Sequence, residues 1–478
     1  MGEMKGKDIT RRDFVKTVGG TVIAASTIGM TARSYARILG ANDRIRLGQL
    51  GCGDCGGSHL QMVHLASQKT PVETVAVCDL WSLARERSAA QARKLFNLEP
   101  HVCQYPEQLL DLKDIDGVMI ATADFQHAKL CAQVVRAGKD CYVEKPFANV
   151  LEDAKEGREA VKSSKQIVQV GTQYRSEPHH IAVRDIIRSG RIGKIVKIEQ
   201  EWDCNQERWR FREDDAGVPP PVLEGKSVHW KQWLDTHPSR LREQDTDWKR
   251  WLLDKPHRAF DPHVYLEFRL YKEFSSGIID QFLSHASDLV HFWMDETYPV
   301  SVTSQGGIFS WNDGRQNPDT IITSFTYPKG FLYSYRTTLG NSYRSFSLIQ
   351  GRDGTIINYG MEGASLFVVT NQGRETDPWE SEPAYTQVPL KTPDQDVAEI
   401  VKVPGAPTPN TLGPSDDEPT HLLNWLEAMR DRKQPAATVD DGFSHSVACI
   451  MATQSYWSGK KLYWDPNREE IIEQPPPV

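Results

Sequence analysis

The chain has 478 residues, of which 39% are hydrophobic and 25% are charged, and its formal net charge is -8. This length predicts two domains, and the composition is that of a globular protein. The acidic balance argues against nucleic acid as a partner, because phosphate backbones select basic surfaces.

The chain begins with a segment typical of an export signal. Residues 10–16 read Thr-Arg-Arg-Asp-Phe-Val-Lys, and a weakly apolar run from Val18 to Ala32 follows. Paired arginines before such a run are typical of the twin-arginine route. The run is too short and too rich in small polar residues for a stable membrane span. We therefore expect residues 1–41 to direct the protein to the periplasm, and the alternative is the N-terminal arm of a cytoplasmic enzyme.

The eight cysteines do not form a disulfide framework, because most of them lie in apolar runs in the first third of the chain. Cys52 and Cys55 form C-x-x-C, the spacing of a redox pair or of half a zinc site. Zinc needs four ligands, and no second C-x-x-C follows. None of the paired histidines has the i,i+4 spacing with a carboxylate that zinc enzymes use. We therefore expect structural thiols and no metal, with a redox or metal role as the alternative.

Residues 42–165 alternate short apolar runs with helical stretches, which predicts a parallel α/β sheet. A strand ending at Leu50 is followed by a G-x-G-x-x-G motif and by a helix over Ser58–Gln68. Glycine is needed in such a motif because the backbone turns sharply and approaches a pyrophosphate at the helix N-terminus. The pattern predicts a Rossmann domain over 42–165.

A second predicted strand, residues 72–79, ends in an acid. Asp79 follows the first glycine of the motif, Gly51, by 79 − 51 = 28 residues. A carboxylate at this place accepts both ribose hydroxyls of the adenosine and repels a 2′-phosphate. The sequence therefore favours NAD over NADP.

Two further strands complete the predicted parallel sheet. One covers Asp116–Ala121 and is followed by a loop over Thr122–His127. The other covers Cys141–Val143 and ends in Glu144-Lys145-Pro146. Pro146 fixes the turn, and the bond before it is a candidate for a cis peptide.

Three motifs carry a resemblance to a known family: G-C-G-D-C-G at 51–56, A-T-A-D-F-Q-H-A at 121–128 and A-G-K-D-C-Y-V-E-K-P at 137–146. From about Asn42 to its end the chain resembles the glucose-fructose oxidoreductase/inositol dehydrogenase/MocA family. The resemblance implies a Rossmann domain followed by an open, mainly antiparallel sheet. The face of that sheet forms the substrate pocket and often a dimer interface. Typical members oxidise or reduce a ring carbon of a sugar, cyclitol or related polyol.

The resemblance also implies a cofactor site. Lys145 matches the family lysine that bridges cofactor and reacting hydroxyl, and a lysine in a closed pocket can relay a proton. The alternative for Lys145 is a solvent-facing residue after a strand. The predicted cofactor-binding residues are Gly51, Cys52, Gly53, Cys55, Gly56, Asp79, Thr122, Asp124, His127, Glu144, Lys145 and Gln173.

A second signature lies in the run I-I-D-Q-F-L-S-H-A-S-D-L-V-H-F-W. His285 matches the family histidine that acts as acid and base at the substrate hydroxyl, and its alternative is a core histidine. Related dehydrogenases usually carry Asp four residues earlier, where this chain has Gln281. Gln cannot ionise, so an Asp–His relay is either missing or rebuilt from Asp280. We predict Lys145, His285, Asp280 and Gln281 as the catalytic set.

The remaining residues, 166–478, are predicted to form the substrate domain. We expect strands over Thr320–Tyr327 and Leu332–Thr337, a surface loop over 376–419, and a helix over 420–432 that packs back near the first domain. Flat aromatic rings stack on sugars and arginines bind hydroxyls, although a core or interface role for the tryptophans is equally open. The predicted substrate-binding residues are Tyr174, Arg175, Trp202, Arg210, Arg269 and Asp288.

These features lead to two enzymatic hypotheses. In the first, His285 and Lys145 take the hydroxyl proton of a polyol while a hydride passes to NAD. In the second, retained NAD oxidises a glycoside, a group is eliminated and the hydride returns, as in a redox-neutral glycosidase or lyase. Export away from the cytoplasmic NAD pool predicts a tightly bound cofactor in both cases. A non-catalytic binding protein is disfavoured because Lys145 and His285 are both present, and we expect a homodimer or homotetramer through the open sheet.

Overall fold

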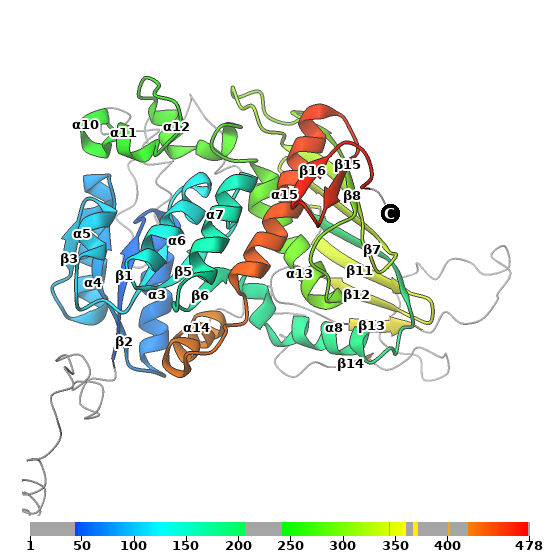
Figure 1. Cartoon of the computed structure of the whole chain (residues 1–478), viewed down its shortest axis with the longest axis horizontal. Coiled ribbons are helices and arrows are strands. Elements are labelled where there is room, and N and C mark those ends of the chain that lie inside the picture. Colours follow the sequence, from blue (N-terminus) through cyan, green and yellow to red (C-terminus); the bar gives the residue numbers. More distant parts are fainter. Residues whose placement is uncertain are drawn as a thin grey trace, which may run out of the picture. The chain divides into compact units, whose positions relative to one another are not determined.

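The described part of the chain contains two β-sheets, one parallel and one mainly antiparallel (Figure 1). The computed structural model describes residues 44–205, 241–343, 345–359, 367–370, 400–401 and 419–476. The predicted export segment, nearly all of the predicted 376–419 loop, and Arg210 lie outside these residues. No helix in the described ranges combines the length and the apolar character needed to cross a bilayer.

The first sheet is parallel and has the strand order β3-β2-β1-β4-β5-β6. Its central strands are buried because helices pack on the sheet, so they read as nearly continuous apolar runs. The order reverses between β1 and β4, and in such folds ligands bind beyond the carboxyl ends of the strands at this point. The elements are β1 (Ile45–Leu50), α3 (Asp54–Ser67), β2 (Val72–Cys78), α4 (Ser82–Phe96), β3 (His101–Cys103), α5 (Pro106–Leu110), β4 (Gly117–Ile120), η1 (Asp124–Gln126), α6 (His127–Arg136), β5 (Asp140–Glu144), α7 (Leu151–Lys162) and β6 (Val168–Gly171).

The second sheet has the order β14-β13-β12-β11-β7-β10-β9-β8-β15-β16, and its only parallel pair among the described strands is β7 with β10. In β9, buried Ile321, Thr323 and Phe325 alternate with more exposed residues, so one face is packed and the other is open. Its strands are β7 (Ile195–Trp202), β8 (Ser301–Gly307), β9 (Thr320–Thr326), β10 (Leu332–Thr338), β11 (Ser345–Gly351), β12 (Thr355–Tyr359), β13 (Phe367–Thr370), β14 (Ile400–Val401), β15 (Leu462–Asp465) and β16 (Glu470–Ile472).

The remaining helices lie in the chain between β6 and β15. A π-helical turn, η6, runs directly into α13, and π-turns are frequent at functional sites. The helices are η2 (Gln173–Ser176), α8 (Pro178–Arg188), α10 (Glu243–Thr246), α11 (Trp248–Trp251), α12 (Pro262–Leu266), η5 (Phe268–Leu270), η6 (Ile279–Leu283), α13 (Ser284–Met294), α14 (Thr420–Asp431) and α15 (Val439–Ser458).

The predicted fold class is confirmed: a Rossmann sheet is followed by an open, mainly antiparallel sheet. The strands predicted over 320–327 and 332–337 correspond to β9 and β10. Strand β6 lies beyond residue 165 yet pairs with β5 in the parallel sheet, and the domain boundary itself stays a prediction. Helix α14 contacts the parallel sheet, where its Trp425 packs edge-on against Tyr142 at 5.7 Å between ring centroids.

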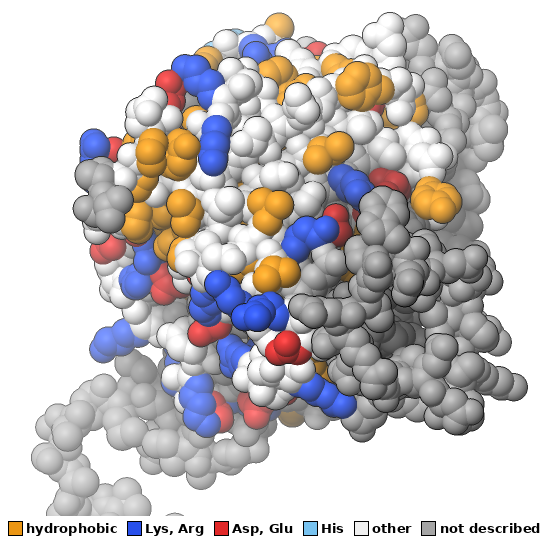
Figure 2. Space-filling model, turned by 90° about the vertical axis from the view of Figure 1, so that its right-hand side faces the viewer, with side chains coloured by type: hydrophobic (Ala, Val, Ile, Leu, Met, Phe, Trp, Pro, Cys, Tyr) orange, Lys and Arg blue, Asp and Glu red, His pale blue; other side chains and the backbone are white. Residues whose placement is uncertain are grey.

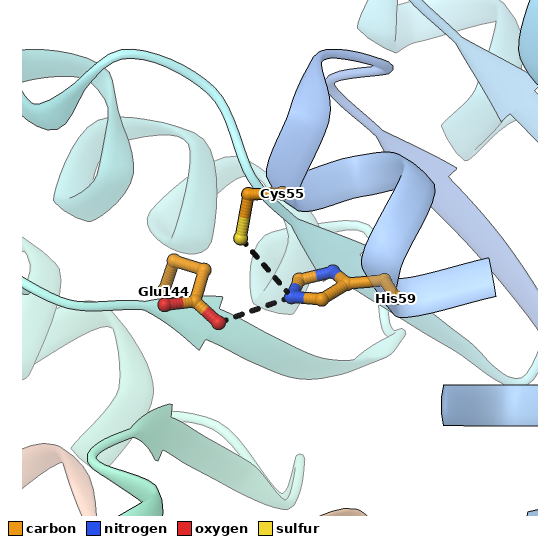
Figure 3. A group of neighbouring side chains, drawn as sticks. All are labelled: Cys55, His59 and Glu144. Carbon is orange, nitrogen blue, oxygen red and sulfur yellow. Dashed lines mark hydrogen bonds and ion pairs between the residues drawn. The ribbon is translucent and has the colours of Figure 1, made fainter. Parts of the chain in front are cut away.

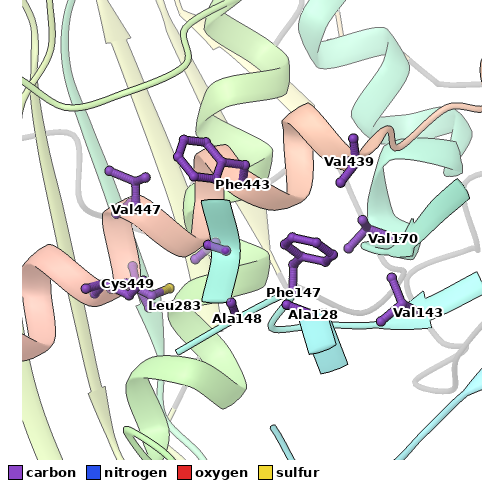
Figure 4. Packing of buried hydrophobic residues seen from close by; sticks show 14 of the residues in the cluster. Ala128, Val143, Phe147, Ala148, Val170, Leu283, Val439, Phe443, Val447 and Cys449 are labelled. Carbon is purple, nitrogen blue, oxygen red and sulfur yellow. The ribbon is translucent and has the colours of Figure 1, made fainter. Parts of the chain in front are cut away.

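Helix α15 lies between the two sheets and packs on β8 as well as on α7 and β6. Its Phe443 is fully buried and shares a core with Phe147 and Val170 (Figure 4). A Cβ atom at Gly442 would lie 2.7 Å from a methyl carbon of Val170, so the absence of a side chain lets the helix approach this closely. The core around α15 therefore joins the two halves of the described chain.

Figure 2 shows the side of the molecule on which the second sheet lies. Over the described part of this side, hydrophobic side chains form small groups between lysine and arginine side chains. Among the described residues of the second sheet, Ile322 on β9 and Leu332 on β10 are exposed apolar side chains, with 53% and 42% of their surface exposed. Exposed apolar residues scattered among charged ones are ordinary on protein surfaces, and oligomerisation through this sheet stays a prediction.

We predict that Phe443→Ala lowers the free energy of unfolding by about 3–5 kcal/mol, because the change leaves a cavity between the two halves. Gln454→Ala on the exposed side of the same helix is the matched control and should change stability by no more than about 0.5 kcal/mol. Urea unfolding followed by tryptophan fluorescence measures both. Equal small effects of the two substitutions would contradict the role given to Phe443.

Candidate active site

The turn between β1 and α3 can accept a dinucleotide only because of its glycines. Gly51 has a φ of 90°, and a Cβ atom there would lie 2.4 Å from the carbonyl oxygen of Ala121. A Cβ atom at Gly56 would lie 2.1 Å from the carbonyl oxygen of Gly51. By contrast, nothing lies within 4 Å of such an atom at Gly53, so space is left beside the helix N-terminus. This geometry fits a pyrophosphate bound on the first amides of α3.

Asp79 lies next to this turn, at the end of β2. Its Oδ2 accepts a hydrogen bond from the Cys52 amide at 2.7 Å, and its Oδ1 accepts one from the Trp81 amide at 2.8 Å. Burial raises the pKa of the carboxyl, and these two amides oppose the rise. The carboxylate is thus held in one orientation, with its remaining lone pairs available to ribose hydroxyls.

A pocket of about 1080 Å³ runs from the glycine turn to α13. It is large enough for a dinucleotide and a small substrate, since ligand pockets are typically about 300–1,000 Å³. The predicted site residues that line it are Gly51, Gly53, Cys55, Asp79, Thr122, Asp124, His127, Glu144, Lys145, Gln173, Tyr174, Trp202, Arg269, Gln281 and His285.

Lys145 connects the two halves of the pocket. It follows β5, precedes the cis peptide bond to Pro146, and donates a hydrogen bond from Nζ to the carbonyl oxygen of Gln281 at 3.0 Å. Burial lowers the pKa of its ammonium group, although the nearby carboxylates of Glu144 and Asp124 oppose this effect. The solvent-facing alternative for Lys145 is therefore wrong.

His285 lies in the first turn of α13, directly after the π-helical turn. Its ring lies 4.9 Å from that of Tyr174 and 6.0 Å from that of Trp202, measured between centroids. Its Nδ1 is buried and makes no hydrogen bond to the described residues. Burial, and after it the positive charge of Lys145, lowers the pKa of His285 well below its usual value. The imidazole is therefore neutral at neutral pH and able to accept a proton.

The carboxylate that reaches the pocket beside these groups belongs to Asp124. Its Oδ2 accepts hydrogen bonds from Gln281 Nε2 at 2.7 Å and from Ser275 Oγ at 2.6 Å. Asp280 is fully buried outside the pocket lining and accepts a hydrogen bond from the Ser276 amide at 2.6 Å. Of the two alternatives for the Asp–His relay, the one rebuilt from Asp280 is wrong, because the π-turn directs Gln281 rather than Asp280 to the pocket.

Arg175 and Asp288, both predicted to bind substrate, lie outside the pocket lining and bind each other. Arg175 Nε lies 2.7 Å from Asp288 Oδ2, and its Nη1 lies 2.9 Å from Asp441 Oδ1 on α15. Burial alone would raise the pKa of Asp288, but chiefly the Arg175 charge lowers it to about 2. Both side chains are committed to this ion pair, so we revise their expected role to positioning.

Two predicted cofactor residues also lie outside the lining. The thiol of Cys52 turns away to the carbonyl oxygen of Cys78, at 3.5 Å, while Cys55 faces the pocket. Gly56 does not line the pocket; it lets α3 pack closely against the backbone of Gly51. The two thiols of the C-x-x-C motif therefore point to different places, Cys52 to the backbone of β2 and Cys55 to the pocket.

The tryptophans serve two different purposes. Trp202 and Trp251 line the pocket. Trp248 is fully buried and stacks on Trp251 at 4.8 Å between centroids, within a small aromatic core. A core role is therefore shown for Trp248, whereas stacking of Trp202 on a sugar stays a prediction.

The sequence did not single out His445, whose role is to position the segment after Lys145. Its Nε2 accepts a hydrogen bond from the Phe147 amide at 3.2 Å, and Ser446 Oγ accepts one from the Ala148 amide at 3.1 Å. These partners are separated by 298 residues, so no local pattern could indicate them. His59, also not singled out, lies one helical turn after Cys55, and that i,i+4 spacing was a usable signal.

A Rossmann sheet with this glycine turn, joined to a second domain that adds a histidine to the same pocket, defines a dinucleotide-binding oxidoreductase. Residues 45–172 match an oxidoreductase family with an NAD-binding Rossmann fold, and residues 257–463 match the C-terminal alpha/beta domain of that family. The chain therefore belongs to the glucose-fructose oxidoreductase/inositol dehydrogenase/MocA family, and its cofactor is NAD.

Relatives with described activities cover part of the chain. Inositol 2-dehydrogenase 2 of Saccharopolyspora erythraea is 27% identical over 191 residues, which are 39% of this chain and 51% of that protein. A glycosyl hydrolase family 109 protein of a Shewanella species is 25% identical over 228 residues, 44% of this chain and 49% of that protein. The chain spans about half the length of the curated relatives it matches. A levoglucosan dehydrogenase in complex with NADH and levoglucosan shares the fold, with a TM-score of 0.61 at 16% identity over 88% of this chain and 99% of that chain.

We predict that stability depends on the protonation of Asp280. Burial, aided by the Asp124 charge, raises the pKa of this carboxyl from 3.8 to about 7 in the folded protein. The folded state therefore keeps a proton that the unfolded state has lost, and the associated stability disappears as pH rises from about 4 to about 7. The loss amounts to at most about 4 kcal/mol.

The test is urea unfolding of wild type and Asp280→Asn across this pH range. Relative to wild type, the variant should become more stable as pH rises, because Asn keeps an acceptor for the Ser276 amide but does not titrate. Asp185→Asn on the exposed face of α8 is the control and should follow wild type. Parallel curves for Asp280→Asn and wild type would show that Asp280 is ionised throughout.

Proposed function

We propose that the chain is an NAD-dependent oxidoreductase that acts on a ring hydroxyl of a sugar, cyclitol or glycoside. The observation that carries this proposal is the convergence of Lys145 and His285 on one pocket with the dinucleotide turn. The dehydrogenases among the relatives support a polyol substrate, and the rings of Trp202 and Tyr174 offer flat faces on which a sugar can stack.

In the proposed reaction, NAD supplies the hydride acceptor. Neutral His285 takes the hydroxyl proton as the adjacent ring C–H bond breaks, so that one proton and one hydride leave the substrate. Lys145 keeps a positive charge or a hydrogen-bond donor near the developing carbonyl oxygen. Asp124, held by Gln281 and Ser275, supplies the nearby negative charge that balances Lys145.

A second candidate is redox-neutral glycoside cleavage in the same pocket. The similarity to a glycosyl hydrolase family 109 protein favours it, and so does Gln281 at the position where a dehydrogenase carries Asp. Here the substrate would be oxidised to a ketone with NAD as the hydride acceptor, and the neighbouring carbon would lose a proton as the aglycone leaves with a proton. Water would then add its hydroxyl group to the carbon that lost the aglycone and its proton to the neighbouring carbon. The hydride and a proton would finally restore the oxidised hydroxyl group. Tight retention of NAD, export to the periplasm and a homo-oligomer are proposals that accompany both candidates.

We predict that the purified full-length protein, without added cofactor, reduces its bound NAD when given a substrate from a panel of cyclitols, free sugars, anhydrosugars and glycosides. Nicotinamide absorbance and product chromatography are recorded together in deuterated water. Net reduction without cleavage supports the dehydrogenase. Cleavage without net reduction, with deuterium on the neighbouring carbon, replaces it by the second candidate. If no panel member reacts with protein that holds NAD, the polyol proposal is wrong.

For whichever compound reacts, we predict that His285→Asn lowers kcat by about 10²–10⁴-fold while NADH binding is kept, because general-base catalysis is lost but the dinucleotide turn is untouched. His257→Asn, an exposed histidine in a loop, is the matched control and should retain activity. Single-turnover kinetics and NADH titration separate the two effects. An unchanged kcat in His285→Asn would remove this histidine from the mechanism.

A further inference from the structure

Three side chains with metal-binding atoms converge beside the dinucleotide turn. Cys55 and His59 lie one turn apart on α3, and Glu144 ends β5, so both thiol and carboxylate point toward the same imidazole (Figure 3). His59 Nε2 lies 3.7 Å from Cys55 Sγ and 3.0 Å from Glu144 Oε1. The three ligand atoms all lie within 4.8 Å of one another.

A neighbouring amide orients His59 as metal-binding histidines are oriented. Gln49 Nε2 donates to the carbonyl oxygen of Gly51 at 2.9 Å, which leaves its Oε1 to accept from His59 Nδ1 at 3.2 Å. When a metal ion replaces the proton that Nε2 shares with Glu144, the ring keeps its other proton on Nδ1 and presents the Nε2 lone pair to the ion. Histidines that bind metals almost always donate their other N–H to such an acceptor.

The spacing of the atoms matches a tetrahedral ion. Zinc bonds of about 2.3 Å to sulfur and about 2.0 Å to nitrogen or oxygen place sulfur and nitrogen about 3.6 Å apart, and nitrogen and oxygen about 3.3 Å apart. Both separations are within a few tenths of an ångström of those found here. In the ion-free protein the same atoms form a hydrogen-bonded cluster, with His59 Nε2 beside both the Glu144 carboxylate and the Cys55 thiol. A metal ion in place of the Nε2 proton would bind all three groups at once.

We propose that Cys55, His59 and Glu144 bind one divalent, zinc-like metal ion whose fourth coordination position opens to the dinucleotide pocket. Cys55 and Glu144 both line that pocket, whereas His59 is only 1% exposed and anchors the site from within. Three protein ligands with one open position are typical of non-structural zinc sites. The open position would take water or an anionic oxygen of a bound ligand. The sequence-based expectation of no metal rested on histidine pairs and on a second C-x-x-C, whereas the proposed site combines Cys55 of the one C-x-x-C with a single histidine and a glutamate.

The test is metal content of the full chain, purified with a tag that contains no histidine, stripped of nucleotide and of metal, and then dialysed against Zn²⁺ or Co²⁺. We expect about one ion per chain by plasma mass spectrometry. The Co²⁺ form should show sulfur-to-metal charge-transfer absorption, which reports on thiolate ligation directly.

Cys55→Ser and His59→Gln should each reduce the bound ion to background and abolish the charge-transfer band. The matched controls are Cys103→Ser, a thiol on β3 outside the cluster, and His64→Gln, a second histidine of α3 outside the cluster. Both should retain the ion. If His59→Gln does not fold by circular dichroism, Cys55→Ser decides alone, since Cys55 is exposed.

Two outcomes overturn the proposal: wild type that retains no ion, and Cys55→Ser that retains as much as wild type. In the first of these outcomes, rapid alkylation of Cys55 would identify the cluster as a thiolate–imidazolium pair instead. Because no turnover is measured, failure of the metal site leaves the proposed oxidoreductase function standing.

Discussion

The buried ion pair between Arg175 and Asp288 is the interaction on which the position of His285 relative to the parallel sheet depends. It joins the segment after the last parallel strand to α13, and the second contact of Arg175, to Asp441, adds α15. Asp288 has no solvent exposure, so removing one partner would leave a buried charge uncompensated, which typically costs about 3–5 kcal/mol. His285 lies on the same helix as Asp288, one turn earlier, and inherits its position from this pair.

Helix α15, which contacts Arg175 through Asp441, also positions the segment that follows Lys145. His445 and Ser446 on α15 accept hydrogen bonds from the amides of Phe147 and Ala148, directly after the Lys145–Pro146 bond. His445 Nδ1 in turn lies 3.8 Å from Asp288 Oδ1. Because the Arg175 charge keeps the pKa of Asp288 low, the Asp288 carboxylate stays ionised at neutral pH. Lysine and histidine are thus positioned by one network although they come from different domains.

The fold could be predicted because its signals are local. The strand, the glycine turn and Asp79 lie within 35 residues, and each obeys a short-range rule of backbone geometry or charge. Most of the pocket could be predicted as well, since strand ends in a parallel sheet meet at one edge. The long-range pairings of side chains in and around the pocket could not be predicted. Whether Arg175 faces a substrate or Asp288 is decided by contacts between residues 113 positions apart, on which periodicity carries no information.

Spacing also misled where the helix is not an α-helix. The carboxylate expected near His285 is displaced by one residue in the sequence, and the structure places a π-helical turn at that point. In such a turn Gln281 meets Asp124 and Asp280 turns to a buried serine amide. Which of the two side chains, the ionisable Asp280 or the neutral Gln281, lines the pocket therefore depends on the number of residues in this turn. In evolutionary terms, a one-residue insertion or deletion before α13 would exchange the side chain that lines the pocket in a single step, whereas a point substitution would have to accommodate a new charge in the existing helix.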